Sequence, residues 1–386
     1  MRPAKNLLLA QNPPLWKGKT GRKNRNSPQT KHLPILSPPN GEPDDMTVAV
    51  QQFAPQQGDS EKIDVAMNIF AKPYQTALSV LSLLKHSGNH VGNVWLQFEP
   101  YGSQYDIVSP YALVQYLGSL IGGRCRVFQP DYWLDLNAAD PARFADDAYR
   151  YGIRYQYAFE HSTSRRLFLM HNDVLVLKDV LGYLGGLMGD AVAVGHLGQC
   201  WNCPAHVEEL TREVMGCEPC GPERYMDFRP DYNQLQKLYA LAHQREIFAR
   251  PYDHGFAGIF DAQPWPLPEC RVNEWACLLD LERTRPLCVP HGPVLSPGAY
   301  RQCGPVCLDI GVEWFRGVHA RGMIARHADL SRHLRHWVGT GKVTARLYAL
   351  AEENALKILL TTFPDYCDWL RGTIGNKPLG VSDRVR

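Results

Sequence analysis

The segment Leu167-Phe168-Leu169-Met170-His171-Asn172-Asp173 decides the fold, because an apolar run of four residues ends abruptly in three polar ones. Such a run is typical of a strand that is buried on both faces of a parallel sheet. In open α/β sheets, ligands bind beyond the carboxyl ends of the strands, where these polar residues fall. Asn172-Asp173 is also ordinary turn sequence, so the polar end alone indicates either a site or a turn.

Apolar runs and helical patterns alternate on both sides of this segment. The predicted strands are 65–70, 94–98, 125–128 and 191–195, and the predicted helices are 75–85, 110–121, 141–159 and 175–188. This alternation predicts an α/β fold with a mostly parallel sheet flanked by helices. After residue 195 strands and helices no longer alternate regularly. We expect a Cys-rich, partly helical second half with helices at 204–215, 321–337 and 343–360.

Composition and charge exclude several classes of protein. The chain has 386 residues, of which 45% are hydrophobic, so it is not disordered as a whole. Residues 1–40 carry eight basic residues, no acid and seven prolines, so we expect 1–60 to be a disordered, basic, Pro-rich leader. The net charge of +2 argues against a nucleic-acid coat protein, and no apolar run is long enough to cross a membrane. We expect a cytoplasmic protein without a nucleic-acid partner, and the leader suits peripheral contact with an anionic membrane surface.

The eleven cysteines lie in a chain without a recognisable export signal, so thiols or metal ligands are expected in place of disulfides. Two Cys-x-x-Cys pairs are separated by 13 residues, and four thiolates at this spacing predict a structural Zn²⁺ site formed by Cys200, Cys203, Cys217 and Cys220. Buried free thiols and a redox pair are the alternatives. A second zinc site formed by Cys288, His291, Cys303 and Cys307 is not decided by the sequence.

Residues 63–195 resemble the glycosyltransferases of the GT-A fold, in particular the family-2-like group. The resemblance rests on Asn68-Ile69-Phe70-Ala71-Lys72-Pro73-Tyr74, on Glu99 after the next strand, and on Leu169-Met170-His171-Asn172-Asp173 in the place of an Asp-x-Asp metal motif. It implies that 61–195 binds a nucleotide-sugar donor and that 196–386 forms the acceptor side. It also implies that Asp173, with His171, holds Mn²⁺ or Mg²⁺. Because His171 replaces the first Asp of the motif, a metal-independent variant remains an alternative.

The resemblance also assigns residues to the donor and to catalysis. A basic segment late in the chain can approach the donor diphosphate in such enzymes, and His319, Arg321 and His336 are the residues here that suit this role. A solvated basic helix is the structural alternative for this segment. The donor-binding residues so implied are Phe70, Ala71, Lys72, Tyr74, Glu99, Asn172 and His336. An acid followed by an aromatic residue suggests Glu274 as the base of an inverting enzyme, with Glu313 and then Asp309 as lesser candidates. A glutamate at a helix N-terminus is the structural alternative for Glu274.

The leading hypothesis is therefore a metal-assisted, inverting glycosyltransferase. It moves a sugar from a nucleotide-sugar to a hydroxyl group of a glycan, a lipid-linked glycan or a protein. The second hypothesis is a non-enzymatic, zinc-containing interaction protein, motivated by the altered metal motif and the cysteine pairs. The third is a thiol oxidoreductase that uses Cys200 and Cys203.

Overall fold

The computed structural model describes residues 62–99, 111–132, 134, 138–199, 207–216, 231–246, 270–303, 306–336, 345–375 and 379–380. The chain divides into two compact units, and all of these residues belong to the second, Asp44–Arg386. The predicted leader and the four cysteines of the predicted zinc site, Cys200, Cys203, Cys217 and Cys220, lie outside the described residues.

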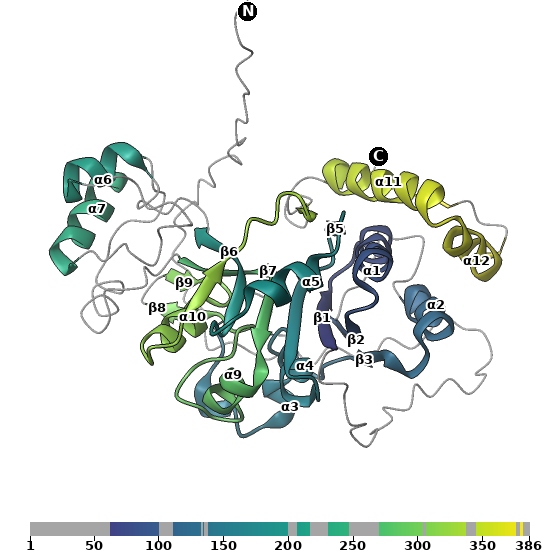
Figure 1. Cartoon of the computed structure of the whole chain (residues 1–386), viewed down its shortest axis with the longest axis horizontal. Helices are drawn as coiled ribbons and strands as arrows, with labels where there is room; N and C mark the ends of the chain where they lie inside the picture. The colour runs from purple at the N-terminus through teal and green to yellow at the C-terminus, as the bar shows by residue number, and fades with distance from the viewer. Residues whose placement is uncertain are drawn as a thin grey trace, which may run out of the picture. The chain divides into compact units, whose positions relative to one another are not determined.

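A seven-stranded sheet forms the centre of the described part (Figure 1). In sheet order, the strands are β10 (Ala325–His327), β6 (Ala193–Gln199), β7 (Cys270–Asp280), β4 (Arg166–His171), β1 (Ile63–Ile69), β2 (Val91–Phe98) and β3 (Cys125–Phe128). Every neighbouring pair is parallel except the two pairs made by β7, which runs antiparallel to both β4 and β6. The predicted α/β class with a mostly parallel sheet is confirmed.

Two small antiparallel pairs contain the remaining strands of the part of the chain that the structure describes. One consists of β5 (Val174–Val176) and β11 (Leu334–His336), and the other of β8 (Arg301–Cys303) and β9 (Val306–Leu308). In the first pair His336 lies opposite Val174, the residue directly after Asp173. A short strand late in the chain therefore reaches the end of β4.

Helices flank the sheet, and the predicted helices at 75–85, 110–121 and 343–360 are confirmed as α1, α2 and α11. The α-helices are α1 (Pro73–Ser87), α2 (Tyr111–Ile121), α3 (Asp147–Arg150), α4 (Gln156–His161), α5 (Val180–Leu187), α6 (Glu208–Met215), α7 (Tyr232–Gln244), α9 (Leu281–Cys288), α10 (Val312–His319), α11 (Ala345–Thr362) and α12 (Pro364–Ile374). Two 3₁₀ turns, η1 (Gly122–Arg124) and η2 (Pro141–Arg143), accompany them. No helix among the described residues has both the length and the apolarity needed to cross a membrane.

The predicted helix 204–215 is confirmed only as the shorter α6, which begins at Glu208. Three further predicted helices are wrong in whole or in part. The predicted helix 141–159 is broken into η2, α3 and α4, and Tyr155 interrupts it with a left-handed backbone at φ 62°. The predicted helix 175–188 begins only at Val180, because Asp179 caps it and the residues before form β5.

The predicted helix 321–337 does not form at all. Its residues instead supply β10 and β11, which pair with β6 and β5. Pairing with strands that are distant in the sequence thus overrides the local helical pattern.

Strand β4 separates two hydrophobic layers. Phe168 and Met170 pack in one core cluster with α1 and α5, whereas Leu167 and Leu169 pack in a second with β7 and α10. All four side chains are fully buried, as expected for a strand with helices on both faces. The core therefore fixes β4 and, with it, the position where its polar end emerges.

Replacing Leu278 tests the packing of β7 beside β4. Leu278 is fully buried in the first cluster, so Leu278→Ala should lower the free energy of unfolding by about 2–5 kcal/mol. Leu350→Ala, at a position that is 49% exposed on α11, should change it by less than about 0.5 kcal/mol. Urea unfolding measures both, and equal losses would contradict the central place of β7.

Candidate functional site

Polar residues from several strands meet at one edge of the sheet. Asn68 lies opposite His171 on one side and Gln97 on the other, so β1, β2 and β4 end side by side. The antiparallel β7 begins at this same edge, where Ala276 pairs with Met170 and Glu274 lies beyond it. This is the edge at which ligands bind in open α/β sheets.

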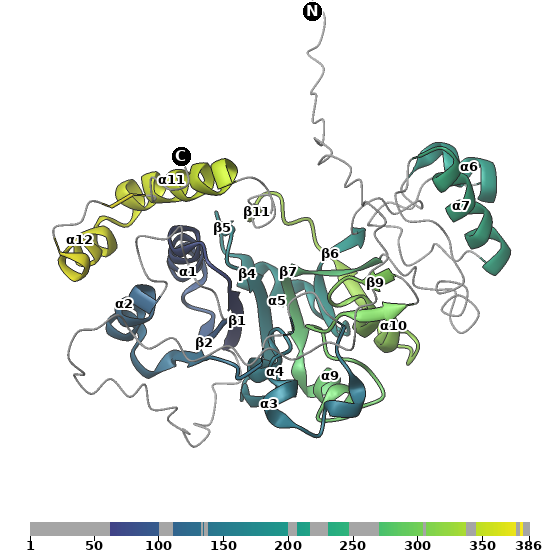
Figure 2. The ribbon, with the colours of Figure 1, turned by 180° about the vertical axis from the view of Figure 1, so that it is seen from behind.

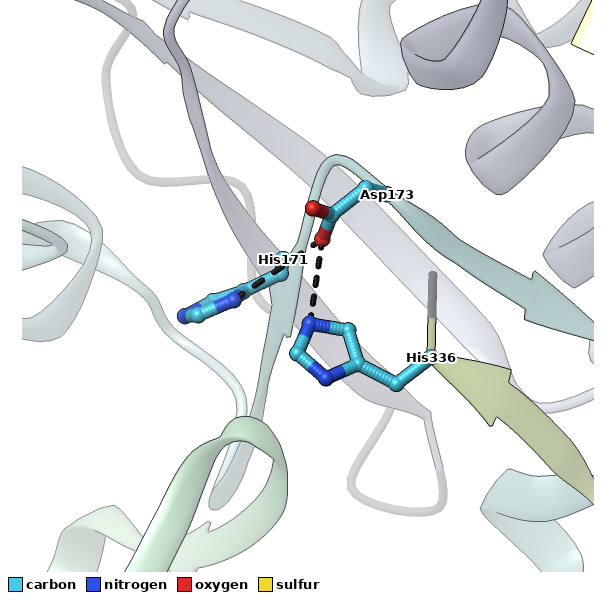
Figure 3. Close-up of side chains that lie close together, drawn as sticks. All are labelled: His171, Asp173 and His336. Carbon is cyan, nitrogen blue, oxygen red and sulfur yellow. Dashed lines mark ion pairs between the residues drawn. The ribbon is translucent and has the colours of Figure 1, made fainter. Parts of the chain in front are cut away.

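His171, Asp173 and His336 form the centre of this edge (Figure 3). Asp173 Oδ1 lies 3.2 Å from His336 Nε2 and 3.9 Å from His171 Nδ1. One potential ligand atom from each residue lies within 4.8 Å of the others. The sequence placed His171 and Asp173 together, and the β5–β11 pair adds His336.

Lys72 binds the other oxygen of the same carboxylate, with 2.7 Å between Lys72 Nζ and Asp173 Oδ2. Burial alone raises the pKa of Asp173, but the nearby His336, Lys72 and His171 outweigh it and hold the pKa well below its usual range. Asp173 is therefore ionised, although its side chain is only 3% exposed. Asp173 Oδ1 and His336 Nε2 lie 3.2 Å apart, but neither atom makes a hydrogen bond of good geometry among the described residues.

These residues fit a divalent cation. A buried carboxylate oxygen without a hydrogen-bond partner faces two imidazoles, and such a mixed set suits Mn²⁺ and other first-row metals better than Mg²⁺. On its far side, His171 Nε2 lies 3.5 Å from Glu274 Oε1. A carboxylate behind a histidine ring fixes the orientation of the ring towards a metal. The ring of Trp275 stacks parallel to His336 at 4.9 Å and holds the second imidazole.

Glu274 lies in β7, so the alternative of a helix N-terminus is wrong for it. Its Oε2 accepts a hydrogen bond from Arg271 Nε at 2.7 Å, and Arg271 Nη2 lies 3.4 Å from Asp309 Oδ2. Burial alone raises the pKa of Glu274, but Arg271 and His171 outweigh it, so the pKa lies well below the usual range. Glu274 is thus a buried anion with both oxygens engaged. Glu313 pairs with Arg301 at 3.5 Å, outside this network.

Glu99 has a cationic partner that the sequence analysis did not assign. Arg154 Nε donates to Glu99 Oε1 at 2.7 Å, and Asn68 donates to the same oxygen at 3.2 Å. The Glu99 side chain is 3% exposed, whereas that of Arg154 is 26% exposed. Arg154 is therefore the member of this pair that a ligand reaches more easily.

Other predicted donor residues support the local backbone. The Asn172 amide donates to the Ala71 carbonyl at 3.2 Å and to Thr76 Oγ1 at 2.9 Å, so it fixes the turn after β1. The Tyr74 side chain is buried and its hydroxyl donates to the Gly380 carbonyl at 3.2 Å. Phe70, at the end of β1, is partly buried.

The three residues predicted from the late basic segment do not lie together. His336 joins the cluster, but Arg321 donates to the Gly317 carbonyl, and the His319 ring packs against Phe315.

The predicted second zinc set is described only in part. Cys288 Sγ lies 3.7 Å from the Leu295 carbonyl, and burial raises the pKa of this thiol to about 12. The His291 ring stacks against Phe144 at 6.1 Å. The side chains of Cys303 and Cys307 are outside the described part, so this zinc site stays an untested prediction.

Three residues at this edge were missed by the sequence analysis: Arg271, Arg154 as the partner of Glu99, and Glu352 of α11, which binds the start of α1. The spacing of three between Arg271 and Glu274 predicts a pair on a helix but not on a strand, so it gave no usable signal for two residues of β7. Nothing local indicated Glu352, which is 278 residues from Tyr74.

No protein-family model and no curated protein matches the chain. Solved structures do match it at low similarity. The mannosyltransferase Ktr4p from S. cerevisiae is 14% identical over 58% of each chain, with a TM-score of 0.30. Its complex with GDP is 12% identical over 68% of this chain and 62% of that chain, also at 0.30. Mouse xyloside xylosyltransferase 1 is 12% identical over 70% of this chain and 85% of that chain, at 0.32. The chain thus spans about 60% of the Ktr4p chains that it matches.

Replacing Glu274 should destabilise the protein in a pH-dependent way. Glu274→Gln leaves the Arg271 guanidinium buried with Asp309 alone, so the free energy of unfolding should fall by about 3–5 kcal/mol at neutral pH. Because the folded pKa lies below the unfolded value of about 4.3, the ionised carboxylate stabilises the fold above that pH. The difference between wild type and variant should shrink as the pH falls below about 4.3, and it should be lost once the pH has fallen through the folded pKa.

Urea unfolding at neutral pH and at about pH 3 measures this difference. Glu282→Gln is the control, because the Glu282 side chain is 69% exposed and its pair with Arg165 is solvated. A loss for Glu274→Gln that is small, or the same at both pH values, would contradict the buried ion pair.

Proposed function

We propose that the protein is a nucleotide-sugar-dependent glycosyltransferase that uses a divalent cation. The observation that carries the proposal is Asp173, an ionised and buried carboxylate at the carboxyl edge of a mostly parallel sheet, facing two imidazoles and bound by Lys72. The resemblance of 68–74, Glu99 and 169–173 to GT-A glycosyltransferases supports the same reading. The acceptor is a hydroxyl group of a glycan, a lipid-linked glycan or a protein.

The charges of the site suit a diphosphate only when a cation is present. Lys72 and Arg271 face three carboxylates, those of Asp173, Glu274 and Asp309, so with neutral imidazoles the network has a surplus of negative charge. A divalent cation reverses this surplus and, when bound, neutralises the charge that develops on the leaving diphosphate. Asp173, His171 and His336 would hold it.

The remaining residues orient this centre and bind the donor. Glu274 holds the His171 ring, and Trp275 holds that of His336. Lys72 and Arg154, the cations that flank the end of β1, suit the donor phosphates and ribose.

The sequence predicted Glu274 as the base that takes the acceptor proton. Its lowered pKa and its two partners favour the orienting role instead, since a general base works best when its pKa lies near the ambient pH. We propose Asp309, whose side chain is 21% exposed, as the carboxylate that takes this proton in an inverting transfer.

The zinc site of Cys200, Cys203, Cys217 and Cys220 stays a prediction, because these residues are not described. One zinc per chain by metal analysis, lost in Cys200→Ser with Cys203→Ser, would support it. Such a protein without nucleotide binding would be the non-enzymatic zinc protein, whereas exchangeable Cys200 and Cys203 thiols without zinc would support an oxidoreductase.

Thermal unfolding with nucleoside diphosphates tests the proposed donor site. UDP, GDP, CDP and dTDP and their sugars are each added with Mn²⁺ or Mg²⁺ to wild type and to Asp173→Asn. A ligand at a hundred times its dissociation constant adds about 2.7 kcal/mol of stability. One nucleotide should raise the melting temperature of wild type, more with Mn²⁺ than with Mg²⁺, and the rise should vanish in Asp173→Asn.

Asp190→Asn is the matched control, because this carboxylate is 74% exposed and pairs with Arg326 away from the cluster. It should respond to the nucleotide as wild type does. If no nucleotide shifts the folded wild type, or if Asp173→Asn responds fully, the proposed donor site is wrong.

A further inference from the structure

The turn between β1 and α1 has a backbone that two ordinary residues rarely adopt. Ala71 and Lys72 are both left-handed, with φ 55° and 58°. This conformation is unfavourable for residues that carry a side chain, and two in succession persist only where surrounding groups hold them. The Lys72 ammonium group is the one that pairs with Asp173, so this strained backbone also determines where that ammonium group lies.

The groups that hold this turn come largely from α11, which packs against α1 and lies above it in Figure 2. The Lys72 amide donates to Tyr348 Oη at 3.0 Å. The amides of Tyr74 and Gln75 donate to the two oxygens of Glu352 at 2.9 and 3.1 Å. Because Pro73 has no N–H group, α11 satisfies every backbone donor from the N-cap to the third helical position.

Glu352 also replaces the cap that the sequence of α1 lacks. The N-cap residue is Lys72, whose side chain makes no capping hydrogen bond, and the first turn contains no acid. Glu352 is 1% exposed and receives a third hydrogen bond, from Gln75 Nε2 at 3.0 Å. The positive end of α1 is therefore filled by a carboxylate of the protein and is not open to a phosphate.

We infer that Tyr348 and Glu352 are positioning residues, which act through the β1–α1 turn to hold the Lys72 ammonium group on Asp173. Without them, the turn relaxes to ordinary backbone angles and Lys72 leaves the carboxylate. The helix α11, late in the chain, thus supports a site whose other residues lie at or just beyond the ends of strands. The inference that α11 positions Lys72 follows from this geometry alone, whereas its consequence for donor binding rests on the proposed function.

Chemical labelling of Lys72 tests the inference without any ligand. The folded protein is treated briefly with an amine-acetylating reagent, and the modification of each lysine is measured by mass spectrometry. Lys72 should react slowly in wild type, because its side chain is 10% exposed and ion-paired, while the exposed Lys85 reacts fast. Tyr348→Phe and Glu352→Gln should each raise the rate at Lys72 by roughly tenfold and leave the rate at Lys85 unchanged.

Glu353→Gln is the matched control, since it makes the same chemical change one residue along α11, and it should label as wild type does. Tyr348→Phe removes a single hydroxyl group, so it decides the question if Glu352→Gln does not fold. Unchanged protection of Lys72 in the folded variants would overturn the inference. So would a rise at all lysines together, which indicates general loosening.

A second measurement on the same proteins separates this inference from the proposed function. Mn²⁺ binding by calorimetry should tighten in Glu352→Gln, because the positive charge of Lys72 no longer lies beside the Asp173 carboxylate, where it repels the cation, and this gain should vanish when Lys72→Met is already present. If labelling at Lys72 rises while no form binds a nucleoside diphosphate, the positioning stands and the proposed function falls. If a nucleoside diphosphate binds while Lys72 stays protected in every variant, the proposed function stands and the positioning inference is wrong.

Discussion

The ion pair between Lys72 and the buried carboxylate of Asp173 is the constraint on which the rest of the site depends. A carboxylate with 3% exposure stays ionised only where cations replace the water that it has lost. Lys72 supplies one of them, and the imidazoles of His171 and His336 face the oxygen that has no hydrogen-bond partner. The Asp173 carboxylate therefore stays negatively charged at the edge of the sheet, although burial alone would favour its protonated form.

The antiparallel strand β7 extends this arrangement into a network. By entering a sheet that is otherwise parallel, it brings Glu274 behind His171 and Trp275 against His336. Arg271 then links Glu274 to Asp309. Each buried carboxylate thus has a cationic partner, Lys72 for Asp173 and Arg271 for both Glu274 and Asp309. With two such cations for three carboxylates, the network has a surplus of negative charge when the imidazoles are neutral.

The features that the sequence predicted correctly are those that a local pattern of residues determines. The apolar run 167–170 specified a buried strand, and the position of Asp173 directly after it specified the edge at which it emerges. The failure at 321–337 and the missed partners share one cause, which is pairing between segments far apart in the sequence. Residues 321–337 carry a helical pattern, yet tertiary pairing makes strands of them and delivers His336. Glu274 was identified, but its partners Arg271 and His171 meet only after β7 pairs with β4. The role of Glu352 depends on how α11 packs on α1, which no local pattern encodes.

The most direct test of the account is pulsed electron paramagnetic resonance of Mn²⁺ bound to the protein with the nucleoside diphosphate that stabilises it. The account predicts magnetic coupling of one manganese ion both to imidazole nitrogen, from His171 and His336, and to phosphorus of the diphosphate. The nitrogen coupling should weaken in His336→Gln. Manganese that couples to phosphorus without any imidazole nitrogen would show that the cation binds elsewhere, and would contradict a donor site built on Asp173 and its two histidines.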